Sequence, residues 1–397
     1  MSVGTAFHAR TLAYNRKMQW REWSGYFAAS VYADFHDIEY NAIREQAALI
    51  DVSPLYKYEV HGPDAEQLVD RVITRDATKL KVGQVFYGPW CDEDGKVVDD
   101  GTIHRLGPNR FRWTAADPQF RWLSLNAAGL DVTIDDTSEA TAALALQGPL
   151  SRAVLEAAGA GDLADLRYFR RRTATIAGIP IDISRTGYTG DLGYELWVAA
   201  ERAVDLWDAV ITAGKPYGIR PAGMIALDVV RLEAGLILLE VDYTSARHAM
   251  NADQAYSPGE IGLGKLVDFE KGDFVGRRAL LEERRRGGPR RRLVGLEISW
   301  PDIDAMYNAQ GLPPGAPAVV DRSAIPLYDA GGRQVGRITS HGWSPILKKP
   351  IALASVPPAY ERPGTQLQAE WTVEARRGRV AATVVKLPFL DLQRKRA

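Results

Sequence analysis

The stretch SRTGYTGDLGYELWV, residues Ser184–Val198, determines how the rest of the chain can be organised. It joins two short apolar runs, Ile181–Ile183 and Leu196–Val198, whose composition is typical of strands. Glycine has no Cβ, so it tolerates positive φ and lets other atoms approach the backbone closely. The stretch contains glycine at positions 187, 190 and 193. The spacing therefore predicts a β-hairpin with a glycine-rich turn.

Three side chains of this hairpin have ligand-binding chemistry, namely Tyr188, Tyr194 and Glu195. The two phenols offer flat apolar surfaces with hydroxyl groups, and the carboxylate can accept paired hydrogen bonds from a planar ligand. We expect the turn to present these side chains to a ligand rather than bury them. A hairpin whose glycines serve only the turn is the alternative that the spacing leaves open.

The composition excludes several function classes. The chain has 397 residues, 46% of them hydrophobic, which is enough for two or three domains with their own cores. Lys and Arg total 49 against 50 Asp and Glu, a balance that gives no general attraction to nucleic acid or an anionic membrane. No apolar segment approaches the roughly 18 residues of a membrane span, and the N-terminus lacks a signal-peptide core, so we expect a soluble, cytoplasmic protein.

The sequence indicates no metal site. Its single cysteine, Cys91, excludes an internal disulfide and a cysteine-cluster site, and its six histidines show no HxH or HExxH spacing. The segment Gly259–Lys265 resembles a phosphate loop, but Leu266 stands where that motif needs Ser or Thr. One basic run, Arg284–Arg292, is either a solvated linker between domains or a local anion-binding site.

Apolar periodicity places helices and strands on both sides of the central stretch. Before it we expect a helix over residues 39–52, a strand over 57–61, a helix over 65–73 capped by Asp64, and hairpin strands over 85–90, 96–98, 102–106 and 110–114. One strand over 174–184 leads into the stretch, and helices over 201–214 and 221–234 follow it, each stopped by a glycine. The repeated order of strands and helix predicts two related α+β units.

From Arg292 onward the sequence changes character. Short strand candidates alternate with Gly and Pro turns, and almost no helical pattern remains; the candidates are LVGLEI, AIPLYD, RQVGRITS, PIALASV, QLQAEWTV and VAATVVKL. Closely spaced strands of this kind predict a small antiparallel barrel or sandwich.

Charged residues at two further positions are chemical candidates. The pair Asp99-Asp100 precedes Gly101, and a carboxylate held at a glycine turn can stabilise a transient positive charge or exchange a proton. The same pair could instead cap its own hairpin as an Asx turn. Arg231 borders the apolar stripe of the 221–234 helix, so it either snorkels to solvent or has a buried acidic partner.

Motifs along nearly the whole chain resemble the aminomethyltransferase family, whose archetype is the glycine cleavage system T-protein and whose members transfer one-carbon units to tetrahydrofolate. They are AALIDVSPLYKYEVHGPDA (47–65), GKVVDDG (95–101), LALQGP (144–149), TGYTGDLGYE (186–195), GMIALDVVRLEAG (223–235), KGDFVGRRAL (271–280) and ITSHGWSPILKKPIALASVP (338–357). The resemblance implies an α+β fold of three domains. Two interleaved domains around a central cavity would occupy residues 1–285, and an antiparallel β-barrel would occupy 290–397.

The resemblance also implies roles for individual residues. Asp100 matches the aspartate beside the folate nitrogen that gains the one-carbon group, with Asp99 as the less favoured candidate, and Tyr188 matches a catalytic-site tyrosine flanking the cavity. Glu195 matches the glutamate that hydrogen-bonds the pterin ring. The other implied folate-binding residues are Arg231, which would support the folate pocket, and Tyr87, near the pterin. Four further residues, which take no role from the resemblance, are weaker substrate-side candidates, namely Trp23, His36, Tyr56 and Trp343.

The sequence departs from the T-protein pattern at several points. It reads Asp-Val-Ser-Pro54 where the T-protein reads Asp-Val-Ser-His, in a segment that borders the active cavity, and this argues against the glycine-cleavage substrate. Segments 242–257 and 300–317 look like insertions that either reshape the donor pocket or form surface loops. A related folate-binding scaffold has Lys-Gly-Cys-Tyr where this chain has Lys271-Gly-Asp-Phe274, which argues against that non-enzymatic relative.

The sequence therefore predicts a tetrahydrofolate-dependent one-carbon transferase that demethylates a small O-, S- or N-methylated molecule. Tetrahydrofolate is the expected acceptor and a small molecule the expected donor, with no nucleic acid, membrane or obligatory carrier protein as partner. The alternatives are a glycine cleavage aminomethyltransferase that accepts a lipoyl-carrier intermediate, and a non-enzymatic folate-binding assembly factor.

Overall fold

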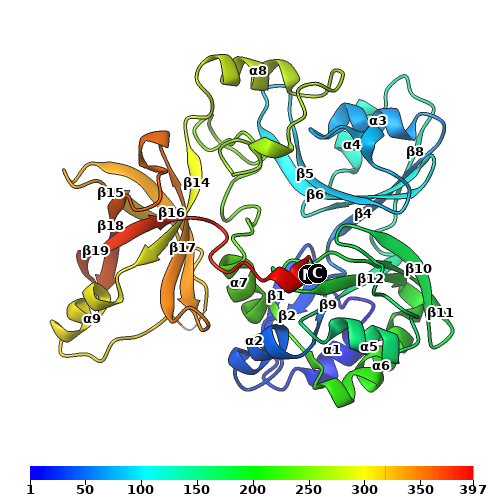
Figure 1. Cartoon of the computed structure of the whole chain (residues 1–397), viewed down its shortest axis with the longest axis horizontal. Helices are drawn as coiled ribbons and strands as arrows, with labels where there is room; N and C mark the ends of the chain where they lie inside the picture. The colour runs from blue at the N-terminus through cyan, green and yellow to red at the C-terminus, as the bar shows by residue number, and fades with distance from the viewer. Residues whose placement is uncertain (318, 397) are drawn as a thin grey trace. The chain divides into compact units, whose positions relative to one another are not determined.

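The computed structural model describes residues 1–317 and 319–396, which form two compact units (Figure 1). Unit 1 comprises Met1–Trp90, Asp99–Leu227 and the chain from Leu392, and unit 2 comprises Cys91–Val98 and Asp228–Asp391. Within the described residues, no helix has the length and apolar character needed to span a bilayer.

Unit 1 contains a six-stranded sheet in the order β10-β11-β12-β9-β3-β13. Neighbouring strands are antiparallel, except that β13 pairs with β3 in parallel. The central stretch of the sequence forms the end of β11, the connecting loop and most of β12. The strands are β3 (Ala48–Asp51), β9 (Thr141–Gln147), β10 (Arg171–Ile176), β11 (Ile179–Ser184), β12 (Gly193–Ala199) and β13 (Arg220–Pro221).

A five-stranded sheet has the order β5-β6-β7-β4-β8, and a separate hairpin pairs β1 with β2. The chain leaves the six-stranded sheet after β3, builds the five-stranded sheet and returns at β9, so the two layers are interleaved in sequence as predicted. The strands are β1 (Trp20–Trp23), β2 (Tyr26–Ala29), β4 (Tyr56–His61), β5 (Val85–Cys91), β6 (Val97–Gly107), β7 (Arg110–Ala115) and β8 (Thr133–Asp136).

Helices cover one face of the six-stranded sheet, where α5 and α6 lie against β12 (Figure 1). Their apolar side chains, including Leu155 and Trp207, form one buried core with Leu146 and Leu196 of the sheet. The helices of this part of the chain are α1 (His8–Tyr14), α2 (His36–Glu45), α3 (Ala65–Val72), α4 (Phe120–Asn126), α5 (Ser151–Ala157), α6 (Ala203–Gly214) and α7 (Met224–Glu233), which continues from unit 1 into unit 2.

Unit 2 contains a closed antiparallel barrel in the order β14-β17-β16-β15-β18-β19, which confirms the predicted barrel. Its interior is filled by apolar side chains such as Leu296, Leu327 and Val380. The elements are α8 (Arg277–Arg285), β14 (Arg292–Ile298), α9 (Trp300–Asn308), β15 (Ile325–Tyr328), β16 (Gln334–Ser344), β17 (Lys349–Val356), β18 (Gln366–Val373) and β19 (Arg376–Val385).

The helix expected over residues 39–52 is wrong in its second half. α2 ends at Glu45, and Gln46 leaves the helical region with φ −133° and ψ −119°. Ala48–Asp51 forms a strand between β9 and β13, and Ala48, Leu49 and Ile50 are fully buried. A strand buried on both faces lacks the apolar–polar alternation that separates a strand from a helix in sequence.

Three other local expectations are corrected. Residues 174–184 do not form one strand, because Ala177 and Gly178 take positive φ and turn the chain between β10 and β11. Asp64 does not cap α3 with its side chain, since its carboxylate accepts a hydrogen bond from the Asp131 amide. Gly214 is the last residue of α6 rather than its stop, and the left-handed residue is Gly218.

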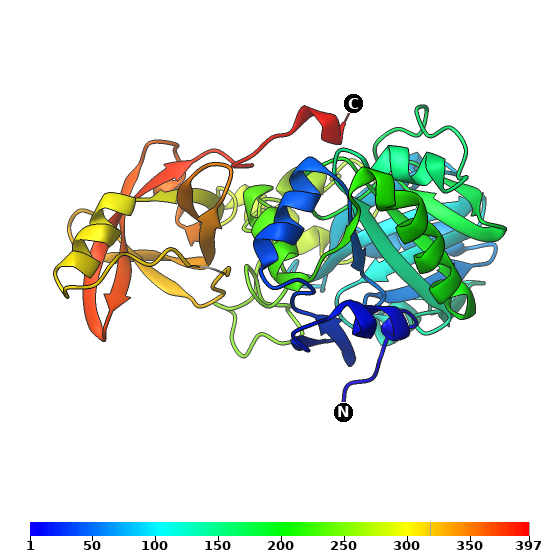
Figure 2. The same ribbon diagram turned by 90° about the horizontal axis from the view of Figure 1, so that it is seen from below.

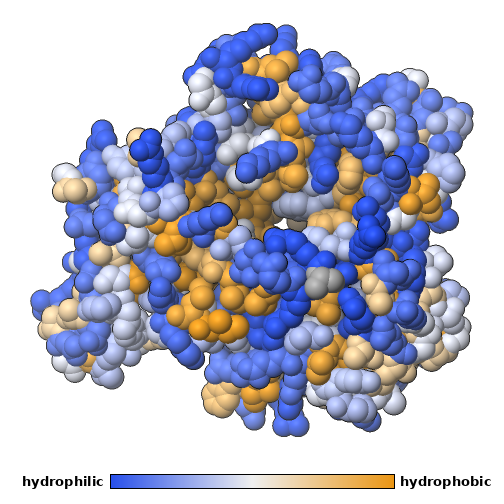
Figure 3. Space-filling model, in the orientation of Figure 1, coloured by the Kyte–Doolittle hydropathy of each residue, from blue (hydrophilic) through white to orange (hydrophobic). Residues whose placement is uncertain are grey.

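Residues 284–286 of the basic run are exposed at the end of α8, as expected of a solvated segment, whereas residues 290–292 contact acidic side chains. Arg291 pairs with the fully buried carboxylate of Glu260 at 3.1 Å, and Arg290 contacts Asp253 at 2.7 Å. Hydrophilic side chains arch over a small apolar patch at the top of Figure 3, where α8 lies. Only the second half of the run is therefore held by the protein, chiefly through Arg291 and the buried carboxylate of Glu260.

Candidate active site

The glycines of the central stretch make room for the side chain of Gln147. A Cβ built on Gly187 or Gly193 would lie 2.1 Å from the Gln147 side-chain oxygen, and only Gly190 of the three has positive φ, at 69°. The buried amide of Gln147 donates to the Thr186 carbonyl at 3.3 Å and accepts from the Thr189 hydroxyl at 2.7 Å. Two of the glycines therefore serve the close approach of a protein side chain, which holds the loop between β11 and β12.

A buried ion cluster fixes the other end of this loop. The carboxylate of Asp191 is fully buried and receives two hydrogen bonds from Arg394, of 2.6 and 2.9 Å. Arg44 lies 3.4 Å from the same carboxylate and donates to the Thr189 carbonyl. In Figure 2 the C-terminal turn lies beside α2, where Arg394 also reaches the Arg44 carbonyl. The cluster ties the loop to α2 and to the C-terminal segment.

The alternation of side chains along β12 separates two of the predicted ligand-binding residues. Tyr194 points into the helix-covered core and is fully buried, so the expectation that the turn presents it is wrong. Glu195 lies on the opposite face and is half-buried. Tyr188 lies in the loop between β11 and β12 and is also half-buried.

The carboxylate of Glu195 lies beside two hydroxyl groups, on the face of β12 opposite the helix-covered core. Its carboxylate accepts a hydrogen bond from the Thr186 hydroxyl, which in turn lies 2.9 Å from the Ser184 hydroxyl. Burial raises the pKa of Glu195, while the hydroxyl hydrogen bonds and the nearby Arg112 oppose this shift. A carboxylate in this position can accept paired hydrogen bonds from a planar ligand.

Asp99 is buried and bonded to the protein itself. Its side chain is 0% exposed, and one oxygen accepts hydrogen bonds from the amides of Ala116 and Asp117 and from the Gln119 side chain. The other oxygen accepts from the Asp100 amide at 2.7 Å. Burial and the adjacent charge raise the pKa of Asp99, against four donors that favour its ionised form. These contacts commit both oxygens of Asp99 to the protein itself.

Asp100 lies on the other side of β6 and pairs with one of the predicted folate-binding residues. The Tyr87 hydroxyl, on β5, donates a 2.7 Å hydrogen bond to Oδ2 of Asp100. Burial and the charge of Asp100 raise the pKa of Tyr87 well above 10, and the phenol of Tyr188 is close enough to contribute. Tyr87 therefore stays protonated and holds one carboxylate oxygen of Asp100 in a fixed direction. The structure brings Tyr87, Asp100 and Tyr188 together.

Sequence reasoning missed an ion network between the two sheets of unit 1. The buried carboxylate of Asp182 on β11 binds Arg112 of β7 at 2.7 Å and Arg171 of β10 at 2.6 Å. Arg112 also lies 4.9 Å from the ring centroid of Trp197, the neighbour of Glu195 on the same face. Burial and Arg112 lower the pKa of His104, which packs edge-on against that ring. These residues come from five strands, β6, β7, β10, β11 and β12, and no local motif links them.

Arg231 lies in unit 2 and has the acidic partners that its position in the helix suggested. It is fully buried on α7, where its guanidinium lies 3.1 Å from Asp228 and 2.7 Å from Asp242. Asp242 also accepts hydrogen bonds from the hydroxyls of Thr339 and Ser340 on β16. The guanidinium thus joins α7 to the barrel wall.

The weaker candidates are divided between the two units. Trp23 ends β1 opposite Tyr26, and His36 begins α2, where burial lowers its pKa. Tyr56 begins β4, and burial together with the nearby charges of Asp117 and Asp136 raises its pKa. Trp343 lies on β16 of unit 2, with its ring edge-on to Trp300 at 5.1 Å.

The departures from the T-protein pattern have defined structures. Pro54 is buried in the turn between β3 and β4, where it offers no side-chain donor or acceptor. The 242–257 segment is anchored within unit 2, because the Ser245 hydroxyl donates to the Val98 carbonyl and Tyr256 accepts from the Val97 amide. The 300–317 segment begins with α9. The predicted effect of both segments on a donor pocket stays a prediction.

Comparisons with known proteins agree on one family. Residues 6–271 match the model of the GCVT N-terminal domain, and residues 291–391 match the glycine cleavage T-protein C-terminal barrel domain. A crystal structure of the glycine cleavage system aminomethyltransferase T from Bartonella henselae superposes with a TM-score of 0.83 at 27% identity. It covers 98% of this chain and 99% of that one.

Two curated relatives span the chain. An aminomethyltransferase of Moorella thermoacetica is 36% identical over 396 residues, which cover 98% of both chains. A trimethylamine-oxide aldolase of Ruegeria pomeroyi is 36% identical over 410 aligned residues, and the match covers all of this chain. The chain spans 48%, about half, of the length of that second relative.

Proposed function

Because the chain belongs to the glycine cleavage T-protein family of aminomethyltransferases, we propose that it is a tetrahydrofolate-dependent one-carbon transferase that demethylates a small molecule. The observation that carries this proposal is the difference in hydrogen-bonding surroundings between the adjacent carboxylates of Asp99 and Asp100. Asp99 is enclosed by four protein donors, whereas Asp100 is held by Tyr87 on the other side of the strand. Only Asp100 is set up to face a reacting group.

The residues of unit 1 fit a pterin ligand. A pterin ring is flat and carries paired N–H donors, and the half-buried carboxylate of Glu195 can accept such a pair. Thr186 orients this carboxylate, and the Gln147 and Asp191 contacts hold the loop in front of it. Tetrahydrofolate would supply the nitrogen that accepts the one-carbon group.

Asp100 would stabilise the charge that develops at this nitrogen. As a carbon–nitrogen bond forms, the nitrogen gains positive charge, which a fixed carboxylate stabilises, and its departing proton needs an acceptor. Tyr87 keeps Asp100 oriented and cannot itself compete as the base, because the pKa of its phenol lies well above 10. We assign Tyr188 to the wall of the same site, and Arg231 keeps in this proposal the folate-supporting role that the family resemblance implies.

The donor in this proposal is a free methylated small molecule. Pro54 cannot replace the hydrogen-bonding or proton-transfer chemistry of the histidine found in the T-protein segment. A relative that matches the whole chain is named for trimethylamine oxide, which makes N-methyl donors the first to test. Trp23, His36, Tyr56 and Trp343 are the substrate-side candidates in this proposal.

The second candidate is a glycine cleavage aminomethyltransferase that works with a lipoylated carrier protein. The Moorella thermoacetica relative and the Bartonella henselae structure favour it, since both match almost end to end. The two candidates differ in carrier dependence and in the group that is transferred.

A donor panel separates these functions. The protein is incubated with tetrahydrofolate and N-, S- or O-methylated donors, with and without lipoylated carrier, and the folate products are identified by mass. Without the carrier, we expect 5-methyl-tetrahydrofolate from a simple methylated donor. We expect 5,10-methylene-tetrahydrofolate only from a donor that is itself reduced in the reaction, such as an amine N-oxide. Turnover only with the lipoylated carrier would support the aminomethyltransferase, and folate binding without any turnover would support the assembly factor.

A further inference from the structure

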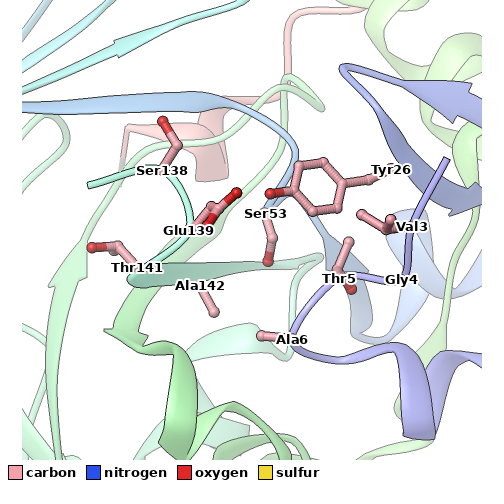
Figure 4. Close-up of a pocket in the computed structure, with 10 residues that line it drawn as sticks. All are labelled: Val3, Gly4, Thr5, Ala6, Tyr26, Ser53, Ser138, Glu139, Thr141 and Ala142. Carbon is pink, nitrogen blue, oxygen red and sulfur yellow. The ribbon is translucent and has the colours of Figure 1, made fainter. Parts of the chain in front are cut away.

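A pocket of about 320 Å³ lies in unit 1. It shares none of its lining residues with those assigned above to folate binding or catalysis. Its walls come from the N-terminal segment Val3–Ala6, from Tyr26 on β2, from Ser53, and from Ser138–Ala142 around the start of β9 (Figure 4). Four segments far apart in sequence therefore converge on it.

Two polar groups of this pocket are available to a ligand. In Figure 4 the Tyr26 hydroxyl and the Glu139 carboxylate point toward one another, and within the described part of the chain neither makes a hydrogen bond. Three other hydroxyls of the wall are engaged, because Ser53 bonds the main chain of Ala143, Ser138 bonds that of Lys57, and Thr5 donates to Asp51. The Thr141 hydroxyl points away from Tyr26 and Glu139 in Figure 4. A ligand would therefore meet one phenol and one carboxylate.

The charges around the pocket are predominantly negative. Burial raises the pKa of Tyr26, and the carboxylates of Glu139 and Asp136 add to this shift, so both lie near the phenol. The ammonium of Lys57 donates to the Ser53 carbonyl at 2.6 Å, and the neighbouring carboxylate of Asp51 offsets its charge. Asp136 also interacts with Lys57, so Glu139 is the carboxylate of the pocket wall that has no cation beside it among the lining residues.

The remaining wall is apolar and small. Val3, Ala6 and Ala142 contribute aliphatic surface, and the Tyr26 ring offers a π face that attracts cations. A cavity of this size is at the lower end of the range for small-molecule sites. We propose that the pocket binds a small organic ammonium ion, with its N–H group on Glu139, its charge near the Tyr26 ring and its alkyl groups on the aliphatic wall.

This inference does not depend on one-carbon transfer and is tested with a probe that has no methyl group on nitrogen. The probes are tert-butylammonium, tert-butanol and pivalate, which share a shape and carry positive, zero and negative charge. Binding to the full chain is followed by saturation-transfer NMR and titration calorimetry. Because Glu139 is exposed at the rim, we expect tert-butylammonium to bind with a Kd of about 1 mM, and the other two at least about tenfold more weakly.

Two variants and a control complete the experiment. Glu139→Gln and Tyr26→Leu should each weaken tert-butylammonium binding by about fivefold or more, while Glu201→Gln, at an exposed glutamate outside the pocket, should leave it unchanged. Asp100→Asn and Glu195→Gln should also leave it unchanged, which separates this pocket from the folate site. Equal binding of all three probes, or undiminished binding in Glu139→Gln with an unaltered melting temperature, would overturn the proposal.

Discussion

The side-chain oxygen of Gln147 lies 2.1 Å from the position that a Cβ on Gly193 would occupy. Gly193 has no positive φ, so its requirement for glycine comes from this contact rather than from backbone conformation. Gln147 is fully buried and uses its amide to bond the loop that carries Tyr188. The contact therefore couples β9 to the candidate active site.

Gly193→Ala should destabilise the protein, because the buried amide must move to admit the methyl group. We expect the free energy of unfolding to fall by about 1–3 kcal/mol, measured by urea denaturation. Gly272→Ala is the matched control, since a Cβ there meets nothing within 4 Å and should change stability by less than about 0.5 kcal/mol. Equal stability of the two variants would contradict the packing role of Gly193.

Asp99→Asn should affect folding rather than chemistry. An amide has one acceptor oxygen, whereas four donors now converge on the two oxygens of Asp99, so the substitution sets an NH2 group against N–H donors. We expect a loss of about 1–3 kcal/mol in unfolding free energy, with Asp94→Asn in the exposed hairpin turn as control. If Asp99→Asn were as stable as the wild type but had lost turnover, Asp99 rather than Asp100 would be the catalytic carboxylate.

Lys57 should make stability rise with pH above neutrality. Burial lowers the pKa of this fully buried ammonium from 10.5 to about 8 in the folded protein. Between these values the unfolded chain binds more protons than the folded one, so the unfolding free energy increases with pH. Burial of the charged ammonium lowers the free energy of unfolding by its full amount below about pH 8, and this loss disappears as the pH rises toward 10.5.

The comparison that isolates Lys57 is with Lys57→Met, which keeps the length of the side chain without a titrating group. Urea unfolding of both proteins at intervals from pH 7 to pH 10 gives the difference in unfolding free energy. The difference should change in favour of the wild type as pH rises. Parallel profiles would show that Lys57 has an ordinary pKa in the folded protein.

Glu195→Gln should weaken tetrahydrofolate binding while the fold persists. The amide replaces one acceptor with a donor, so a pterin N–H group would lose its partner, at a cost of about 1–3 kcal/mol. Titration calorimetry with tetrahydrofolate measures this directly, and the Thr186 contact can still be made by the amide oxygen. Unchanged affinity would return Glu195 to a purely structural role on β12.

Local patterns predicted those features that depend on neighbouring residues. The β5–β6 and β6–β7 hairpins, α3 and the glycine stop at Gly235 follow from alternation and turn residues. The separate strands expected over 96–98 and 102–106 are wrong, because β6 runs through Asp99, Asp100 and Gly101 without a turn. The strand pattern left a barrel or a sandwich open, and the structure shows a closed barrel. The errors arise where burial removes the pattern, as in β3, whose residues Ala48–Ile50 are enclosed on both faces. Tyr194 was misplaced because the face that a strand residue occupies depends on register, and a shift of one residue reverses it.

The site assignment stays a prediction. Of the residues that the resemblance implies, Asp100, Tyr87 and Tyr188 lie near one another in the structure. The sequence left the choice between Asp99 and Asp100 open, and the structure distinguishes them because adjacent strand residues face opposite sides. The Arg112–Asp182 pair joins residues 70 positions apart, so only the folded chain reveals it.

The central claim is that the Asp100 carboxylate stabilises the charge formed when tetrahydrofolate accepts the one-carbon group. The measurement that tests it most directly is turnover of Asp100→Asn with a donor active on the wild type, followed by mass analysis of the folate product. Tetrahydrofolate affinity, measured by calorimetry, should be retained, because the amide has nearly the same size. The account predicts that kcat falls about a hundredfold to a thousandfold. Wild-type kcat in the folded Asp100→Asn variant would contradict it.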